Sequence, residues 1–182
     1  TTPLLPLWHL YSRLALRRGE GIGLQWGDIN DQVGVIYVRH NTTRAWSRVT
    51  TGTPKTPRST RTIPVPPDLL ALLQAHKAGH IKRAAANPDW QVNGLVFTDE
   101  HGAQVRIGHV EWRWSRLRAR AKLPDKVTIH GLRHTALTIM ENNNVAPSVV
   151  QAFAGHSSAT MTRHYTDHTT IENMRKAIEK SA

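Results

Sequence analysis

The sequence contains no cysteine, no long apolar run and comparatively few acidic residues. Without cysteine the chain cannot form disulfides, use a thiolate nucleophile or build a zinc site on sulfur. This composition fits a reducing compartment, so we expect a cytoplasmic protein. No stretch approaches the roughly 18 apolar residues of a membrane span, and the N-terminus lacks the pattern of a signal peptide. We therefore expect a soluble protein with no membrane contact.

The shortage of acidic residues leaves a strongly basic chain. It has 13 Asp and Glu against 24 Lys and Arg, a formal net charge of +11. Such a field attracts polyanions and predicts a nucleic-acid partner, although a DNA enzyme, a passive DNA-binding module and an RNA-binding protein are all this basic. With 182 residues, 39% of them hydrophobic, we expect one domain over residues 1–182. Because the chain begins at Thr1 and not at methionine, we expect it to be a piece of a longer protein.

The apolar pattern predicts a mainly helical α+β domain with a small antiparallel sheet. Helical spacing runs from residue 6 to about 26, with a break expected near Gly19 because three glycines weaken this segment. Strand-like runs at residues 33–39, 45–51 and 61–65 predict a sheet of three strands. Further helices are predicted at residues 68–86, 107–122, 128–141, 147–154 and 170–181. Thr128 is the expected cap of the third of these, and Gly155 the expected end of the fourth.

The segment His130-Gly131-Leu132-Arg133-His134 brings three candidate functional side chains together within five residues. On a helix, His130 and Arg133 can share one face, so an imidazole that handles protons and a bidentate phosphate clamp can serve one target. The ordinary alternative is a buried, hydrogen-bonded histidine. His130 and His134 also have a spacing that can chelate zinc. Because Gly131 stands where a metalloprotease motif has glutamate, and no third ligand is obvious, we expect no metal and no cofactor.

Four more candidates lie elsewhere in the chain. Gly155-His156 follows a predicted helix, and Tyr165 comes nine residues after that histidine. Arg17 precedes the expected break in the first helix. Lys55 lies between the second and third predicted strands, in a loop restrained by two prolines. Taken singly, Lys55 is better explained as part of a solvated basic loop, and Tyr165 as a residue at the edge of the core.

Taken together and in this order, four segments resemble the motifs of the tyrosine recombinase (phage integrase) family. Residues 14–29 resemble its first arginine motif, 53–66 its lysine hairpin, 130–135 its His-x-x-Arg-His motif and 155–165 its Gly-His to Tyr motif. The resemblance covers residues 10–167. It departs from the family at Leu14-Ala15, Gly21 and Asp167, none of which is a catalytic position.

The resemblance implies a helical catalytic domain with a small three-stranded antiparallel sheet, and an enzyme that cleaves and rejoins DNA at specific sites. Tyr165 would attack the scissile phosphate and form a 3′-phosphotyrosyl link, without metal or ATP. Arg17 and Arg133 would clamp the nonbridging oxygens, where negative charge grows in the transition state. The resemblance also implies an N-terminal DNA-binding domain that is absent from this chain.

The remaining residues receive supporting roles by the same resemblance. His130 would assist proton removal from Tyr165, and His156 would hydrogen-bond the phosphate. Lys55 would protonate the leaving 5′-oxygen. Glu20 would be a structural acid that orients Arg17.

Two alternatives share parts of this pattern, a type IB topoisomerase and a catalytically idle DNA-binding relative. The lysine hairpin and Gly155-His156-Ser157-Ser158 favour a recombinase over a topoisomerase, and the complete set of catalytic side chains disfavours an idle relative. The expected partners are double-stranded DNA and accessory DNA-bending or directionality proteins, in a bacterial or phage-encoded system.

The last predicted helix suggests a further partner. Its apolar stripe of Ile171, Met174 and Ile178 has no obvious place on a domain already closed by other helices. Family members use such a tail to dock on a neighbouring copy, so we expect a tetramer on DNA that is linked through this helix. Packing of the stripe on its own domain is the alternative.

Overall fold

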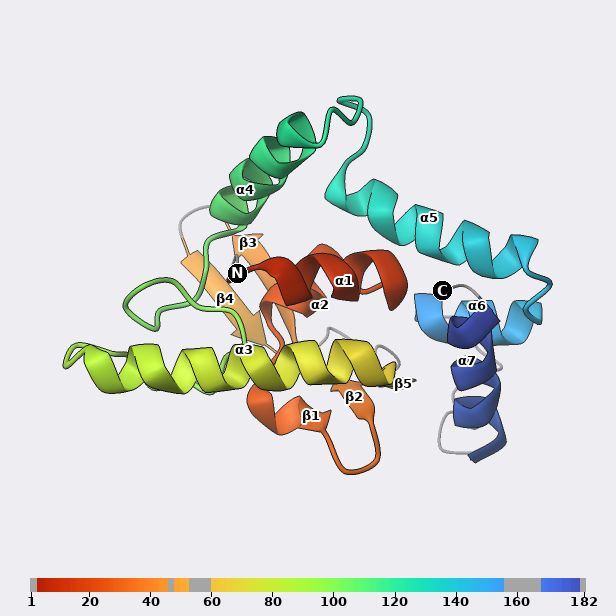
Figure 1. Cartoon of the computed structure of the whole chain (residues 1–182), viewed down its shortest axis with the longest axis horizontal. Coiled ribbons are helices and arrows are strands. Elements are labelled where there is room, and N and C mark those ends of the chain that lie inside the picture. Colours follow the sequence, from red (N-terminus) through yellow and green to blue (C-terminus); the bar gives the residue numbers. More distant parts are fainter. Residues whose placement is uncertain (1–2, 46–47, 53–59, 156–167, 181–182) are drawn as a thin grey trace.

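The structure is a computed structural model that describes residues 3–45, 48–52, 60–155 and 168–180. The described part is mainly helical, as expected (Figure 1). Its helices are α1 (Leu5–Arg13), α2 (Arg18–Ile22), the 3₁₀ turn η1 (Trp26–Asp28), α3 (Pro67–Ala86), α4 (Ile107–Arg120), α5 (Ile129–Asn142), α6 (Pro147–Ala154) and α7 (His168–Lys180). Its strands are β1 (Ile29–Asn30), β2 (Val35–Val38), β3 (Asn41–Ala45), β4 (Arg48–Gly52) and β5 (Arg61–Pro64).

A three-stranded antiparallel sheet is present, but one of its strands differs from the prediction. The strand order is β1-β2-β5, and β2 pairs with β5 so that Ile36 lies opposite Ile63. The second predicted strand, residues 45–51, overlaps β4, but the prediction that it joins this sheet is wrong. β4 instead pairs with β3 in a separate two-stranded sheet, in which Thr42 lies opposite Thr51. The third strand of the larger sheet is β1, which pairs with β2.

The break in the first helical segment comes earlier than predicted. α1 ends at Arg13 and α2 begins at Arg18, and Ala15 between them has a φ of +51°. Gly19 lies inside α2, where a Cβ would come within 2.2 Å of the Asn41 side chain and 2.3 Å of the Thr42 carbonyl oxygen. This glycine is therefore needed for the close approach of α2 to β3 and not for a turn.

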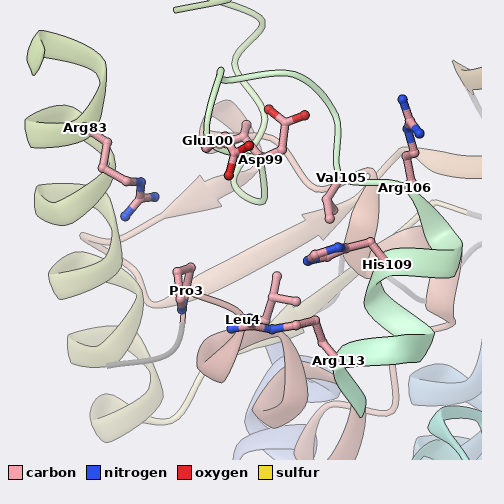
Figure 2. A pocket seen from close by; sticks show the side chains of 10 residues that line it. Pro3, Leu4, Arg83, Asp99, Glu100, Val105, Arg106, His109 and Arg113 are labelled. Atoms are coloured by element: carbon pink, nitrogen blue, oxygen red, sulfur yellow. The ribbon is translucent and has the colours of Figure 1, made fainter. Parts of the chain in front are cut away.

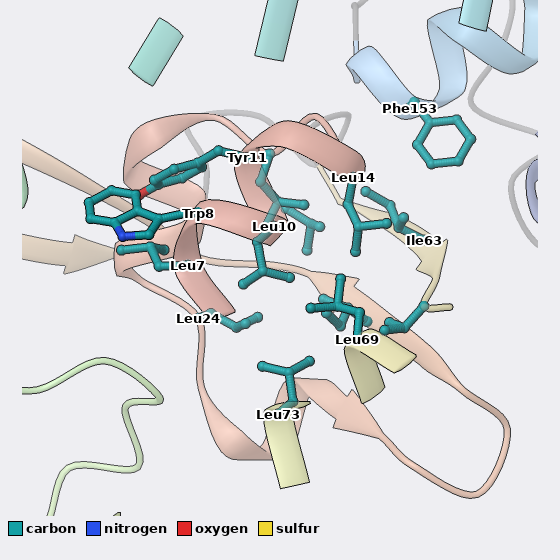
Figure 3. Close-up of a cluster of buried hydrophobic side chains, with 14 of the residues drawn as sticks. Leu7, Trp8, Leu10, Tyr11, Leu14, Leu24, Ile63, Leu69, Leu73 and Phe153 are labelled. Carbon is teal, nitrogen blue, oxygen red and sulfur yellow. The ribbon is translucent and has the colours of Figure 1, made fainter. Parts of the chain in front are cut away.

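The hydrophobic core is built around α1 (Figure 3). Leu7, Leu10 and Leu14 are fully buried, and Leu69 of α3 and Phe153 of α6 are buried with them. Each such side chain contributes about 1.5–3 kcal/mol relative to an exposed one. α1 packs against α3 and α5, so the segment that follows α1 is held between these helices.

Other predicted boundaries are confirmed. Thr128 caps α5, since its hydroxyl accepts a hydrogen bond from the Gly131 backbone N–H at 3.0 Å. α6 ends at Gly155, which has a left-handed φ of +57°. Within the described ranges, no helix combines the length and apolar character that a membrane crossing requires.

The prediction that the C-terminal apolar stripe lacks a place on its own domain is wrong. α7 packs against β5, α6 and α5 of the same chain. Met174 and Ile178 on this face are buried. The Arg175 guanidinium also donates to the Val33 carbonyl at 2.7 Å, and the Asn143 amide donates to the Lys180 carbonyl at 2.8 Å. In this structure α7 covers the sheet and α6 of its own chain.

Candidate active site

Arg17 lies at the junction between α1 and α2 and reaches toward the end of α6. Its Nη1 donates to Oε1 of Glu20 at 2.9 Å, and its Nη2 donates to the Gly155 carbonyl at 3.0 Å. The Arg17 backbone N–H donates to Oε2 of Glu20 at 2.7 Å, so the same carboxylate caps the start of α2. The side chain of Arg17 is 38% exposed. It is thus fixed in orientation yet open to a ligand.

Glu20 is buried between two arginines. Nη1 and Nη2 of Arg61, at the start of β5, donate to the two Glu20 oxygens, each at 2.8 Å. Burial alone raises the pKa of Glu20, but the hydrogen bonds and charge of Arg61, followed by those of Arg17, outweigh it and lower this pKa to about 2. The carboxylate is therefore ionised at any pH at which the protein would work. Its expected role as a structural acid beside Arg17 agrees with these contacts.

Arg61 was not among the site residues predicted from the sequence. Its side chain is 2% exposed, although it lies within the lysine-hairpin motif that directed attention to Lys55. One feature of the sequence could have indicated it, since Arg61 begins the apolar strand Arg61-Thr62-Ile63-Pro64. A cation at such a position is expected to be buried, and a buried cation requires an anionic partner. The identity of that partner, 41 residues away, could not be read from the strand.

Arg133 projects from α5 and is 5% exposed. Its Nη2 donates to the Ala154 carbonyl at 2.6 Å, and its Nη1 donates to the Ala15 carbonyl. Burial, followed by the nearby charges of Arg17 and Arg61, lowers the pKa of Arg133 to about 10, which leaves it charged at neutral pH. The left-handed Ala15 aims its carbonyl at this guanidinium, a conformation that costs roughly 1 kcal/mol or more for a residue with a Cβ.

Arg17, Glu20, Arg61 and Arg133, which we call the arginine cluster, gather at the C-terminal end of α6. Arg17 and Arg133 donate to two of the last carbonyls of that helix, where unpaired C=O groups and the helix dipole favour cations. A Cβ on Gly155 would lie 2.9 Å from Nη1 of Arg61 and 3.3 Å from Nη1 of Arg17. Only glycine fits here, because the position requires both a positive φ and close contact with two guanidinium groups.

A cleft of about 880 Å³ opens beside the arginine cluster. Arg17, His130 and Arg133 line it together with residues of β3 and α4. His130 lies in the first turn of α5 and is exposed. The structure thus brings Arg17, Glu20, His130 and Arg133 together. Lys55, His156 and Tyr165 lie outside the described residues.

The arginines of α4, which the sequence could not sort, separate into two faces. Arg118 lines the 880 Å³ cleft and pairs with Asp125 at 2.5 Å. Arg113, Arg116 and Arg120, with Arg106 just before the helix, share the other face at helical spacing, and none of these four makes an ion pair with a described residue. A second cleft, of about 430 Å³, is lined by Arg106, Arg113 and Arg83 of α3 (Figure 2).

A family model described as the phage integrase family matches residues 6–172. The chain belongs to the phage integrase family. The resemblance inferred from the four motifs is therefore confirmed.

Relatives of this phage integrase family member include recombinases from bacteria and phages. A tyrosine recombinase XerC-like protein of Caldanaerobacter subterraneus is 27% identical over 192 residues, covering 97% of this chain and 48% of that protein. The integrase of Mycobacterium phage FRAT1 is 28% identical over 159 residues, covering 86% of this chain and 46% of that protein. The chain thus spans about half the length of these relatives.

Solved structures agree with the family assignment. The Tn1549 transposon integrase, in complex with a circular intermediate DNA, has a TM-score of 0.72 and 25% identity, covering 98% of this chain and 58% of that chain. The integrase of mycobacterium phage Brujita has a TM-score of 0.68 at 17% identity, covering all of this chain and 52% of that one. The second likeness concerns the fold alone.

Proposed function

We propose that this chain is the catalytic domain of a site-specific recombinase that cleaves and rejoins double-stranded DNA through a phosphotyrosine at Tyr165. The observation that carries this proposal is the convergence of Arg17 and Arg133 on one cleft, next to the end of α6 from which the chain runs on to Tyr165. The relatives named integrase and recombinase, and the solved complex of one of them with DNA, support the same substrate class.

The geometry supports charge stabilisation by fixed guanidinium groups. A scissile phosphodiester carries one negative charge, and attack by a phenolate adds a second in the transition state. The arginine cluster has three cations and one carboxylate and therefore a net charge of +2. Because each arginine is held by groups of the protein, little reorganisation is needed when the charge develops. His130 on the cleft wall would take part in proton transfer, and His156 would hydrogen-bond the phosphate.

The direct test is the trapping of a covalent protein–DNA adduct. A library of nicked duplexes with randomised sequence would be incubated with the protein, and DNA that stays attached after denaturation would be sequenced. We expect one 3′ linkage to Tyr165 within a preferred sequence, formed equally well in EDTA. Tyr165→Phe should abolish the adduct but change DNA affinity by no more than a few-fold, since phosphate contacts dominate binding. An adduct in Tyr165→Phe would place the nucleophile elsewhere, and relaxation of supercoiled plasmid without sequence preference would indicate a topoisomerase.

We also propose that Lys55 protonates the leaving 5′-oxygen. Sulfur at the bridging 5′ position makes the leaving group a thiolate, which needs no proton near neutral pH. Lys55→Ala should then be defective on normal DNA by about 10²- to 10⁴-fold and largely rescued on the sulfur substrate. Arg17→Ala should remain defective on both substrates. Equal defects of Lys55→Ala on the two substrates would exclude the general-acid role.

We propose that the longer protein assembles into a tetramer on its DNA and works with accessory DNA-bending or directionality proteins. If α7 linked the copies, it would have to leave the face that it covers in its own chain. We therefore expect deletion after Asp167 to lower the melting temperature of the chain, because the burial of Met174 and Ile178 is lost. Loss of tetramers on DNA with an unchanged melting temperature would instead favour docking between copies.

A further inference from the structure

Arg61 contributes a full charge to the arginine cluster without reaching the cleft. It is buried, it does not line the cleft, and both of its terminal nitrogens are used on the two oxygens of Glu20. A cation in this position cannot bind a phosphate in the cleft directly. Its hydrogen bonds to the cluster go to Glu20, and its charge also acts on Arg133, so its pairing with Glu20 is one way in which it affects the residues that line the cleft.

Glu20 faces two competing guanidinium groups. A carboxylate and a guanidinium form their strongest pair through two parallel hydrogen bonds. Arg61 has that bidentate arrangement with Glu20, whereas the Arg17 guanidinium donates to Glu20 through Nη1 alone. Arg17 therefore keeps its Nη2 for the Gly155 carbonyl and keeps other N–H donors for a ligand.

Loss of Arg61 would change both the pairing of Glu20 and the net charge of the arginine cluster. Glu20 would keep its negative charge with Arg17 as the remaining guanidinium in contact with it, and the two could form the bidentate pair themselves. Arg17 would then be neutralised and drawn away from the cleft, and the net charge of the cluster would fall from +2 to +1. Arg61 also lies under Gly155, so its loss would open space beside the carbonyl that holds Nη2 of Arg17.

We propose that Arg61 is a positioning residue for catalysis: by occupying both oxygens of Glu20, it lets this carboxylate orient Arg17 without neutralising it. This inference rests on the proposed function of Arg17 as a phosphate clamp. It assigns to the strand after the lysine hairpin a role distinct from that of Lys55.

The test compares Arg61→Met with the double variant Glu20→Gln/Arg61→Met. Arg61→Met removes the counter-charge and leaves Glu20 free to pair with Arg17. The double variant removes both charges at similar side-chain length and restores the net charge of +2. At saturating DNA we expect the rate of adduct formation to fall on the order of 10- to 100-fold in Arg61→Met and to recover several-fold in the double variant. A purely structural role predicts that the second substitution adds damage, so a double variant no faster than Arg61→Met would overturn the proposal.

A second measurement does not depend on cleavage. Phenylglyoxal modifies accessible guanidinium groups, and mass spectrometry reports its rate at Arg17, which is 38% exposed. We expect slower modification of Arg17 in Arg61→Met and recovery in the double variant. Absence of an adduct in the wild-type protein would reject the proposed function, whereas unchanged Arg17 reactivity across these variants would reject the role of Arg61.

Arg61→Lys covers the case in which Arg61→Met fails to fold. Lysine keeps the charge but cannot hold both Glu20 oxygens in a fixed fork. We expect a folded protein with slower adduct formation than wild type, unchanged DNA affinity and slower Arg17 modification. Wild-type values for both rates would overturn the proposal.

Discussion

The arginine cluster buries titratable side chains and a second cluster on α3 half-buries them, but their surroundings favour opposite charge states. In the second, which we call the histidine cluster, His76 and His80 pack against Trp26 at ring-centroid distances of 5.8 and 5.7 Å. His80 also meets Trp90 edge-on at 5.0 Å, and His76 stacks on Phe97 at 5.3 Å. These contacts hold the segment between α3 and α4 against α3.

The two clusters differ in the charge of the groups that surround their titratable side chains. Two charged groups act on the described residues of the histidine cluster, Lys77 over the Trp26 ring and Arg83 beside the imidazoles, and both are cations. Burial, with the charge of Arg83, lowers the pKa of both histidines, although the hydrogen bond from His76 to the Val96 carbonyl at 2.8 Å acts the other way. These shifts favour the neutral imidazole, whereas the hydrogen bonds and charges of Arg61 and Arg17 favour the ionised carboxylate of Glu20. Burial by itself does not decide the charge state; the paired group does.

The most severe way to break the arginine cluster is Arg133→Met. It removes the donors to the Ala15 and Ala154 carbonyls and a cation at the cleft. We expect adduct formation to fall about 10³-fold or more, and unfolding free energy to fall by roughly 1–3 kcal/mol because two carbonyls lose their partner. Arg116→Met, on the exposed outer face of α4, is the matched control and should change stability by less than about 0.5 kcal/mol. Urea unfolding and adduct kinetics would measure both; an Arg133→Met rate within tenfold of wild type would contradict this role.

Gly155→Ala tests the contact between the cluster and α6. The added Cβ would meet Arg61 at 2.9 Å in a backbone with φ +57°. We expect a loss of about 1–3 kcal/mol and slower adduct formation. Gly79→Ala is the matched control, since its Cβ would meet only Arg83 Nη1 at 3.6 Å inside α3, and it should stabilise the chain by about 0.5–1 kcal/mol. If both substitutions had the same sign, the close contact at Gly155 would be refuted.

The loss of folding stability at acid pH should show the contribution of the ionised Glu20 in the arginine cluster. The pKa of Glu20 is about 2 in the folded chain, below its ordinary value of 4.5, so the unfolded chain binds more protons between these values. The stabilisation is fully present above pH 4.5 and is lost as the pH falls toward 2, on the order of 3 kcal/mol in total. Chemical unfolding as a function of pH would measure it. The double variant Glu20→Gln/Arg61→Met should lose this part of the slope, and an unchanged slope would count against the paired carboxylate.

The histidine cluster should affect folding stability at a higher pH, and this effect should be the smallest of those predicted. The pKa values of His76 and His80 are lowered from 6.5 in the fold, so the unfolded chain takes up protons first as the pH falls through 6.5. Stability should therefore decline below about pH 6.5. In His80→Phe we expect a shallower decline and little change at pH 7.5, because Nδ1 of His80 is buried without a hydrogen-bond partner among the described residues. A decline as steep as in the wild type would show that His80 does not carry this effect.

Local features of the site were predictable from the sequence. Thr128 and Gly155 marked the start of α5 and the end of α6 because capping depends on a few adjacent residues. His130 and Arg133 came out on one cleft because their spacing matches a helical turn. Four motifs in order identified the family from the sequence alone, because the characteristic residues of each motif lie within a short segment.

Other features depended on contacts between distant segments. The need for glycine at position 19 comes from β3, and the place of the α7 stripe comes from β5 and α6. The predicted sheet was wrong in its second strand because β4 pairs with β3, and β2 pairs with β1 and β5 instead.

The sequence by itself therefore determined the family and most of the helices, and it supplied the proposed catalytic residues, since these follow from local spacing and side-chain type. Only the tertiary structure decided which charges survive burial. Glu20 and Arg61 are 41 residues apart and neither predicts the other, yet the two hydrogen bonds between them help to keep the buried Glu20 ionised. The charge state of a buried group depends on what packs against it, and that is settled when the chain folds.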